Sequence, residues 1–153
     1  MKVALILLGA VVLAVVAADL GAGGSVPRGD DLPVLAIAAI RDGVSQILVV
    51  DARGKLIAEQ TQPGGAHSPS WSPDGERIAF CSGDNYGPAA GDPPQILVMN
   101  ADGTNAVKLT DEDRFEYCPC WSPDGKKIAF GSQRMLQRQI VVMDADGLNR
   151  TNL

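Results

Sequence analysis

The chain contains 153 residues and carries 13 lysines and arginines against 18 aspartates and glutamates, a formal net charge of −5 at pH 7. This acidic balance argues against nonspecific binding to nucleic acid or to acidic membrane surfaces, so no nucleic-acid partner is expected. The length leaves room for one domain, and a hydrophobic fraction of 46% is enough to build a core.

The N-terminal stretch is typical of a secretory signal peptide. Lys2 precedes an apolar run that continues to Ala18 and ends in small residues. As a helix, this run would reach about 24 Å, short of a hydrocarbon core of about 30 Å. We therefore expect residues 1–18 to form a cleaved signal helix and the protein to be exported, to the periplasm or the extracellular space. An uncleaved anchor is the alternative, and contact with a membrane is expected only in that case.

Residues 19–33 are rich in Gly, Ala, Ser and Pro, so we predict a flexible linker there. Residues 34–40 then read as an apolar strand, residues 46–54 as a strand with a hairpin turn, and residues 55–62 as one more strand. The innermost strand of this first unit has no obvious source in the sequence.

The centre of the chain is a repeat. The stretch WSPDGERIAF at residues 71–80 returns fifty residues later as WSPDGKKIAF at residues 121–130. A second stretch, ILVMNADGTN at residues 96–105, is answered by IVVMDADGLN at residues 140–149. A period of this length is typical of propeller blades and of other repeat arrays.

The repeated positions indicate a structural role, because functional side chains are usually singular and packing residues recur. The recurring tryptophans and phenylalanines are therefore interpreted as core residues between repeats. The structural repeat positions are Trp71, Pro73, Asp74, Gly75, Phe80, Asp102 and Gly103, followed by Trp121, Pro123, Asp124, Gly125, Phe130, Asp146 and Gly147.

Both parts of the repeat predict hairpins. In Ser-Pro-Asp-Gly, proline presets φ, aspartate bonds the local backbone, and glycine adopts the left-handed conformation. The four-residue segments that begin at Asn100 and Asp144 suit a type I turn closed by a glycine bulge. Hairpins imply antiparallel sheet.

The strands between these turns are apolar on both faces. Residues 96–99 and 140–143 are continuous apolar runs, so each strand should be covered on two sides. No helix-length amphipathic segment separates the strands, so the covering layers are expected to be other sheets. The predicted fold class is all-β: after the signal helix, a partial β-propeller of about three four-stranded antiparallel blades, at about residues 34–62, 67–110 and 116–153.

This pattern resembles the WD40-like repeat of the TolB-type β-propellers. The similarity lies in Trp-Ser-Pro-Asp-Gly, in Ile-Ala-Phe, and in the segment from Gln95 to Asn105 that runs into Lys108-Leu109-Thr110. It covers the chain from about Val34 onward. The resemblance implies a propeller that binds other envelope proteins, including a peptidoglycan-associated lipoprotein. It also implies a separate α/β domain and a complete ring, neither of which fits in this length.

Too few blades are present for a closed ring. Aligning residues 146–153 with residues 102–109 places the last residues inside a fourth strand, whereas closed propellers use about four to eight blades. We expect a fragment of a longer propeller. An open arc of blades and a ring completed by self-association are the alternatives.

Residues that carry chemistry are scarce. His67 is the only histidine, and we interpret it as an ordinary surface or rim residue. No Gly-x-Ser-x-Gly motif is present, and one histidine with scattered cysteines does not make a zinc site. Asp144 and Asp146 resemble the start of a calcium loop, but the later ligands are missing. The prediction is therefore a protein that is not an enzyme, with no catalytic residue, metal or cofactor.

The three cysteines are Cys81, Cys118 and Cys120, and an odd number leaves at least one thiol free or paired outside the chain. A bridge from Cys81 to one of the other two is geometrically conceivable. The favoured alternative is that all three are small buried fillers.

A loop at residues 83–94 interrupts the second blade and is rich in Gly, Pro and Asp. Because loops on a rigid scaffold carry recognition, Asp84, Asn85 and Tyr86 are the candidate partner-binding residues. A solvated connector without a role is the alternative.

The expected function is that of an exported, non-catalytic protein-interaction module that resembles the TolB propeller. Its partner would be an envelope protein, or another copy that completes the ring. The alternative is the propeller portion of a larger enzyme, either a prolyl-oligopeptidase-like peptidase or an oligogalacturonate-lyase-like enzyme, because similar repeats form propellers in both.

Overall fold

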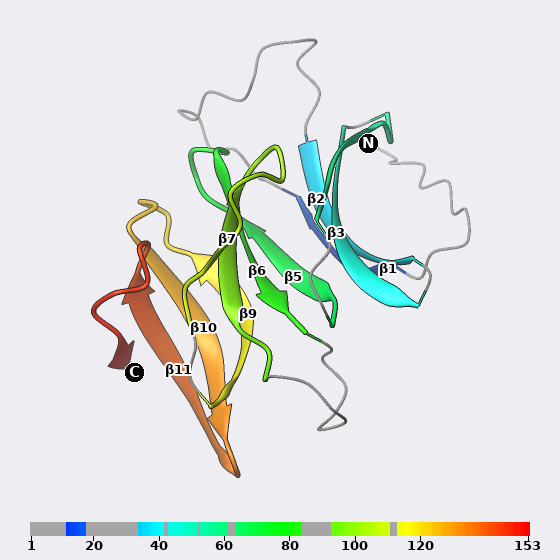
Figure 1. Cartoon of the computed structure of the whole chain (residues 1–153). Coiled ribbons are helices and arrows are strands. Elements are labelled where there is room, and N and C mark those ends of the chain that lie inside the picture. Colours follow the sequence, from blue (N-terminus) through cyan, green and yellow to red (C-terminus); the bar gives the residue numbers. More distant parts are fainter. Residues whose placement is uncertain are drawn as a thin grey trace.

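The structure is a computed structural model, and it describes residues 12–17, 34–41, 43–51, 53–60, 64–83, 93–110 and 113–153. Within these residues every regular element is a β-strand, and the strands form three four-stranded antiparallel sheets that lie side by side (Figure 1). In each sheet, strands that follow one another in sequence are also neighbours in space. The fold is therefore an all-β partial propeller, and we name the sheets blades one, two and three.

Blade one contains β1 (Val12–Ala17), β2 (Val34–Arg41), β3 (Val44–Asp51) and β4 (Leu56–Gln60), in that order across the sheet. Strand β1 pairs antiparallel with β2, with Val16 opposite Ala36 and Ala17 opposite Leu35. The innermost strand that the sequence did not reveal is thus supplied from the N-terminal run.

This pairing differs from the signal helix expected over residues 1–18. Of that segment only residues 12–17 are described, and they form a strand. The reason is local composition: half of β1 is valine, which favours extended backbone, and β2 offers an edge of unpaired backbone groups. The expected linker at residues 19–33 lies outside the described residues. No described helix has the length and apolar character needed to cross a membrane.

Blade two contains β5 (Ala66–Trp71), β6 (Arg77–Ser82), β7 (Ile96–Asn100) and β8 (Val107–Lys108). The outer strand β8 is only two residues long, and Thr110 beyond it turns inward. Its Oγ1 accepts a hydrogen bond from the Ile96 backbone N–H at 2.9 Å and donates to Gln95 Oε1 at 2.8 Å. Gln95 in turn donates from Nε2 to the Arg114 carbonyl oxygen at 3.2 Å, which ties blade two to the start of blade three.

Blade three contains β9 (Phe115–Trp121), β10 (Lys127–Arg134), β11 (Gln137–Asp144) and β12 (Thr151–Asn152). The β10–β11 hairpin is longer than its counterpart in blade two, and it pairs over eight positions from Lys127–Asp144 to Arg134–Gln137. Its tip carries Met135 and Leu136, which are 86% and 99% exposed.

The inner strands of blades two and three share an irregularity. Ser68 and Cys118 are both left-handed, with φ of 53° each, and the pairing register shifts at both places. Such a bulge places one extra residue on the inner strand and increases the local twist. The two repeats therefore agree in a backbone detail that their different side chains do not reveal.

Two apolar clusters lie between the blades. Each blade has two faces. We call the face on the side of the following blade its forward face, and the face on the side of the preceding blade its backward face. Blade one's forward face packs on blade two's backward face, and blade two's forward face packs on blade three's backward face. The forward faces consist of Ala36, Ala38, Ile47 and Val49 in blade one and of Ala79, Cys81, Ile96 and Val98 in blade two. The backward faces consist of Ile78, Phe80, Leu97 and Met99 in blade two and of Ile128, Phe130, Val141 and Met143 in blade three.

Candidate interaction surface

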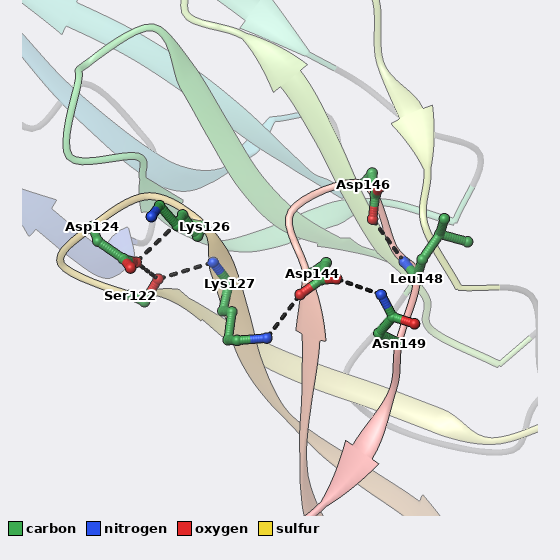
Figure 2. Close-up of polar contacts among 8 residues, drawn as sticks. All are labelled: Ser122, Asp124, Lys126, Lys127, Asp144, Asp146, Leu148 and Asn149. Atoms are coloured by element: carbon green, nitrogen blue, oxygen red, sulfur yellow. Dashed lines mark hydrogen bonds and ion pairs between the residues drawn. The ribbon is translucent and has the colours of Figure 1, made fainter.

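The Ser-Pro-Asp-Gly turns are closed by hydrogen bonds within the repeat. In blade two, Ser72 Oγ donates to an Asp74 carboxylate oxygen at 2.5 Å, and the Glu76 backbone N–H donates to the same oxygen at 3.0 Å. In blade three, Ser122 Oγ donates to Asp124 Oδ1 at 2.6 Å (Figure 2). The following glycines, Gly75 and Gly125, have φ of 73° and 69°. Asp74 and Asp124 therefore each stabilise the turn in which they lie.

These contacts set the charge state of the turn residues. Hydrogen bonds from Ser72 and Ser122, the largest cause in each case, lower the pKa of the Asp74 and Asp124 carboxyls below the ordinary value of 3.8. Lys127 Nζ donates to Asp144 Oδ1 at 2.8 Å (Figure 2), which raises the pKa of Lys127 and lowers the pKa of Asp144. All of these carboxylates are ionised at neutral pH and act as hydrogen-bond acceptors.

The aspartate-glycine turns at the other end of each unit also dock against the preceding blade. Gly103 and Gly147 have φ of 83° and 89°, in the left-handed region that favours glycine. A Cβ at Gly103 would lie 3.2 Å from Ala58 Cβ of blade one, and a Cβ at Gly147 would lie 3.1 Å from the Leu109 carbonyl oxygen of blade two. The glycines thus form the turn and allow the blades to approach closely.

Trp121 packs into the interface between blades two and three. Its side chain is 7% exposed, and its ring centroid lies 4.6 Å from Arg77 Cζ of blade two. This cation–π contact adds electrostatic attraction to apolar packing. Trp71 packs against the equivalent cluster between blades one and two. Phe80 and Phe130, at 0% and 3% exposure, lie in these same clusters.

Blade three's forward face has no described blade against it. The face is formed by Ala129, Gly131, Ile140 and Val142, the positions that in blades one and two are fully packed. Ile140 is 57% exposed, whereas its counterparts Ile47 and Ile96 are both 0% exposed. The three isoleucines align in the sequence, so their positions alone do not show that Ile140 is the exposed one.

A groove of about 450 Å³ lies on this forward face. The Tyr117 ring lies across Gly131, where a Cβ would collide with it, and it forms one wall. Ile140 and Arg138 contribute from β11. The groove therefore combines an apolar floor with a tyrosine hydroxyl and a guanidinium, a composition suited to contact with another protein surface.

The cysteines differ from the favoured expectation of three buried fillers. Only Cys81 is buried, whereas Cys118 and Cys120 are exposed and line the groove, and all three thiols are free. Burial raises the pKa of the Cys81 thiol, with a smaller opposing contribution from a hydrogen bond to the Cys118 backbone. Cys120 lies opposite Ala129 on blade three's forward face, and Cys118 is the left-handed residue of the bulge.

His67 is not the surface or rim residue expected from the sequence. It is 4% exposed, and its Nδ1 lies 3.2 Å from Ser68 Oγ. It lies on β5, the edge strand of blade two, opposite Cys81, which belongs to the apolar cluster between blades two and three. Glu116, also on an inner strand, is 2% exposed and accepts a hydrogen bond from Ser132 Oγ at 3.2 Å.

Other candidate residues give a mixed outcome. Among the described residues, no group of three or more His, Cys, Asp or Glu side chains lies close enough together to hold a metal ion. Asp144 and Asp146 instead accept bonds from Asn149 Nδ2 and the Leu148 backbone N–H (Figure 2). The candidate loop residues Asp84, Asn85 and Tyr86 lie outside the described residues.

Comparison with known proteins identifies the family. A sequence model of the TolB beta propeller domain matches residues 16–153, almost the whole chain. The chain belongs to the TolB beta propeller domain family. No curated protein sequence matches it.

Solved structures show the same fold. A TolB-type protein from Agrobacterium tumefaciens is similar with a TM-score of 0.63 at 28% identity, over 78% of this chain and 41% of that protein. TolB from Acinetobacter baumannii gives a TM-score of 0.59 at 24% identity, over 78% and 29% of the two chains. Prolyl endopeptidases share the fold alone, with a TM-score of 0.58 at 13% identity over 78% and 20%. The chain thus spans less than half the length of these proteins.

Proposed function

We propose that this chain is part of a longer, exported and non-catalytic propeller that acts as a protein-interaction module, and that the forward face of blade three is a contact surface. The observation that carries the proposal is the contrast between Ile140, at 57% exposure, and its counterparts Ile47 and Ile96, at 0%. Apolar surface in contact with water is released when another sheet or side chain covers it, at roughly 25 cal/mol per Å². The face is therefore a favourable place for a partner to bind.

The repeat residues support a binding role over a catalytic one. Asp74, Asp124 and Asp144 accept hydrogen bonds from neighbouring turn residues, and the phenylalanines and Trp121 fill the spaces between blades. Each conspicuous motif therefore has a structural task. The described surface also carries the largely apolar groove on blade three's forward face, which suits protein recognition.

Export is supported by the composition of the N-terminal run and by membership of the TolB beta propeller domain family. The partner is then an envelope protein or a second copy of this chain. Its identity follows from the surface chemistry: it must present bulky apolar side chains that fill the groove beside Tyr117, together with acceptors for Arg138.

A photo-crosslinking experiment tests the proposal. A photoreactive amino acid is placed at Ile140 in the full chain and, as a matched control, at Lys126 in the exposed turn of the same blade. The chains are expressed in the cells that normally produce them, and the envelope fraction is irradiated. We expect a discrete adduct from position 140 and none from position 126. Absence of any adduct at position 140, or recovery of the chain only in the cytoplasm, would contradict the proposal.

The second candidate is the propeller portion of a larger enzyme, favoured by the shared fold of the prolyl endopeptidases. This reading requires a catalytic domain on the same or an adjacent reading frame. Finding a continuous frame that ends in a Gly-x-Ser-x-Gly domain, and peptidase activity that depends on its serine, would favour this candidate over the binding module.

A further inference from the structure

We infer that the tip of the β10–β11 hairpin docks into another protein, and that this partner presents an apolar pocket bordered by acidic side chains. The hairpin tip consists of Arg134, Met135, Leu136 and Gln137, at the ends of the two strands. It is a different surface from the forward face of blade three, because it lies beyond the part of the strands that forms that face.

The hairpin tip stands beyond the level at which the blades pack on one another. In blade two, the β6–β7 pairing ends at Cys81 and Ile96. Their counterparts in blade three are Gly131 and Ile140, and the β10–β11 hairpin continues for three further pairs beyond them. At about 3.3 Å per residue, these pairs carry the tip roughly 10 Å farther, and it projects from the end of blade three (Figure 1). A sheet of blade two's length stacked on the forward face therefore leaves the tip exposed.

The hairpin does not require apolar residues at its tip. Blade one contains a hairpin that also pairs over eight positions and also has a two-residue loop, formed by Asp42 and Gly43. Asp-Gly is one of the dipeptides that such loops favour. Blade three has Met135 and Leu136 in this loop, and they are 86% and 99% exposed. Side chains this exposed add no packing to the blade.

Met135 also adopts a backbone conformation that disfavours its own side chain. Its φ is 54°, in the left-handed region where Cβ is crowded against the backbone. Gly43 has a φ of 78° and no Cβ. The hairpin tip thus combines a left-handed methionine with two large apolar side chains in water, and an Asp-Gly loop avoids both. A local conflict of this kind, with no compensation inside the fold, points to a role in binding.

Gln133 fixes the shape of the tip. Its Nε2 donates to the Met135 carbonyl oxygen at 3.0 Å, and its Oε1 accepts a hydrogen bond from Arg138 Nε at 3.0 Å. A loop that is fixed before binding loses little conformational entropy when a partner covers it. A groove of about 300 Å³ lies beside the hairpin, between Arg138 and Phe115, and Phe115 is 42% exposed. The partner can therefore contact the base of the hairpin as well as its tip.

The charge of the tip defines the chemistry of the partner. Arg134 and Arg138 flank the apolar pair, and residues 131–143 contain no aspartate or glutamate. Within the described part of the chain, neither arginine forms an ion pair. The whole chain carries a net charge of −5, so the tip is a basic spot on an acidic molecule. Carboxylates around an apolar pocket would pair with the arginines while the pocket covers Leu136, and methionine and arginine are both enriched in protein interfaces.

A protein pocket fits this tip better than a lipid surface does. Two apolar side chains provide less membrane affinity than a single myristoyl chain, which by itself binds only marginally. An acidic bilayer also repels a molecule with a net charge of −5. A pocket in a folded protein can enclose Met135 and Leu136, and two carboxylates are enough to match the arginines.

The first test asks whether the tip supports the fold. Met135→Asp combined with Leu136→Gly gives blade three the loop of blade one. We expect the urea midpoint of unfolding to stay or to rise, because a favoured loop replaces a left-handed methionine. A lower midpoint would mean that Met135 and Leu136 stabilise the blade, and it would overturn the inference.

The second test identifies the partner. A photoreactive amino acid replaces Leu136 in the full-length protein or, as a matched control, Leu148, which is 62% exposed beyond the opposite end of β11. The envelope fraction of the producing cells is irradiated, and the protein crosslinked only from position 136 is identified by mass spectrometry and purified. No adduct at position 136, or an adduct only with lipid, with the same protein or with a second copy of it, would overturn the inference. An adduct at position 140 without one at position 136 would leave the proposed function standing.

The third test measures the affinity of the purified partner by fluorescence anisotropy at two salt concentrations. We expect Leu136→Asp and the double loop variant to bind at least tenfold more weakly than the native chain, and Leu148→Asp to bind like it. Arg134→Gln should lower both the affinity and its salt dependence, because one ion pair is lost. Equal binding by Leu136→Asp and Leu148→Asp contradicts docking through the tip.

Vesicles of phosphatidylglycerol and phosphatidylethanolamine provide the lipid probe. We expect the native chain to stay in the supernatant after sedimentation. Binding to these vesicles that the double loop variant loses would assign the tip to a membrane surface and overturn the inference.

Discussion

At the scale of single residues, the glycine of each aspartate-glycine turn meets two requirements at once. Gly147 adopts a left-handed φ of 89°, and it lies against Leu109 of the preceding blade. Gly43, in the β2–β3 hairpin, has a comparable φ of 78° but open space around it. The comparison separates the cost of backbone conformation from the cost of blade packing.

We expect Gly43→Ala to lower the free energy of unfolding by about 1–2 kcal/mol, the cost of left-handed backbone for an L-residue. Gly147→Ala should lose about 1–3 kcal/mol more, because its Cβ is forced toward a backbone carbonyl at 3.1 Å. Urea unfolding followed by tryptophan fluorescence measures both. Equal losses would show that Gly147 is needed for its turn alone and does not set the spacing between blades.

The turns were predictable from the sequence, because each residue type in Ser-Pro-Asp-Gly favours a specific turn conformation or backbone hydrogen bond. The hydrogen bonds of Asp74 and the positive φ of Gly75 follow from residue type alone. The burial of His67 was not predictable in this way, since it depends on a bulge at Ser68, where no glycine marks the left-handed residue.

At the scale of elements, strand β1 decides how blade one is completed. The same residues that read as the core of a signal peptide pair with β2 in a regular antiparallel register. Amphipathic periodicity could not resolve this choice, because a continuous apolar run suits a helix, a buried strand or a signal sequence equally. Cleavage at the expected point after Ala18 would remove β1 and leave β2 as an edge.

We therefore expect a chain that lacks residues 1–18 to lose hydrogen-exchange protection in β2 relative to the full chain, because half of the β2 backbone groups lose their partners. Strand β6, which lies inside blade two, is the internal control and should keep its protection. Hydrogen exchange with mass spectrometry reads both strands in one experiment. Unchanged exchange across residues 34–41 would show that β1 contributes nothing to the folded blade. N-terminal sequencing of the exported protein then tells which form cells make.

At the scale of the whole molecule, blade two belongs to both apolar clusters. Ile78 and Phe80 face blade one, and Ala79 and Cys81 face blade three. Stability in such arrays is the sum of the stabilities of the units and of their shared interfaces. A defect in blade two should therefore be felt at both ends of the chain.

We expect Phe80→Ala to lower the free energy of unfolding by about 3–5 kcal/mol, because a side chain at 0% exposure leaves a cavity. Variants that keep only Trp71 or only Trp121 report on blades two and three separately, and both reporters should show the same shifted transition. Phe115→Ala, at a site 42% exposed, is the control and should cost far less. A Trp121 transition that stays in place would mean that blade three folds independently.

The architecture was predictable at this scale because the repeat and its two-sided apolar strands leave sheet-on-sheet packing as the one solution. The uncovered face was not, because Ile140 and Ile96 occupy identical places in the repeat and differ only in what lies opposite. A sequence pattern specifies what a face can accept, and the three described blades show that Ile140, unlike Ile96, has no described blade opposite it.

The positions of the three thiols allow selective labelling of the groove on blade three. Cys118 and Cys120 stand at the groove in contact with solvent, whereas Cys81 is sealed inside and protonated. A maleimide dye will consequently tag the unmodified protein at the groove and spare the interior. Binding of a partner to the groove can then be followed in real time as a change in the fluorescence of the dye, without any substitution in the chain.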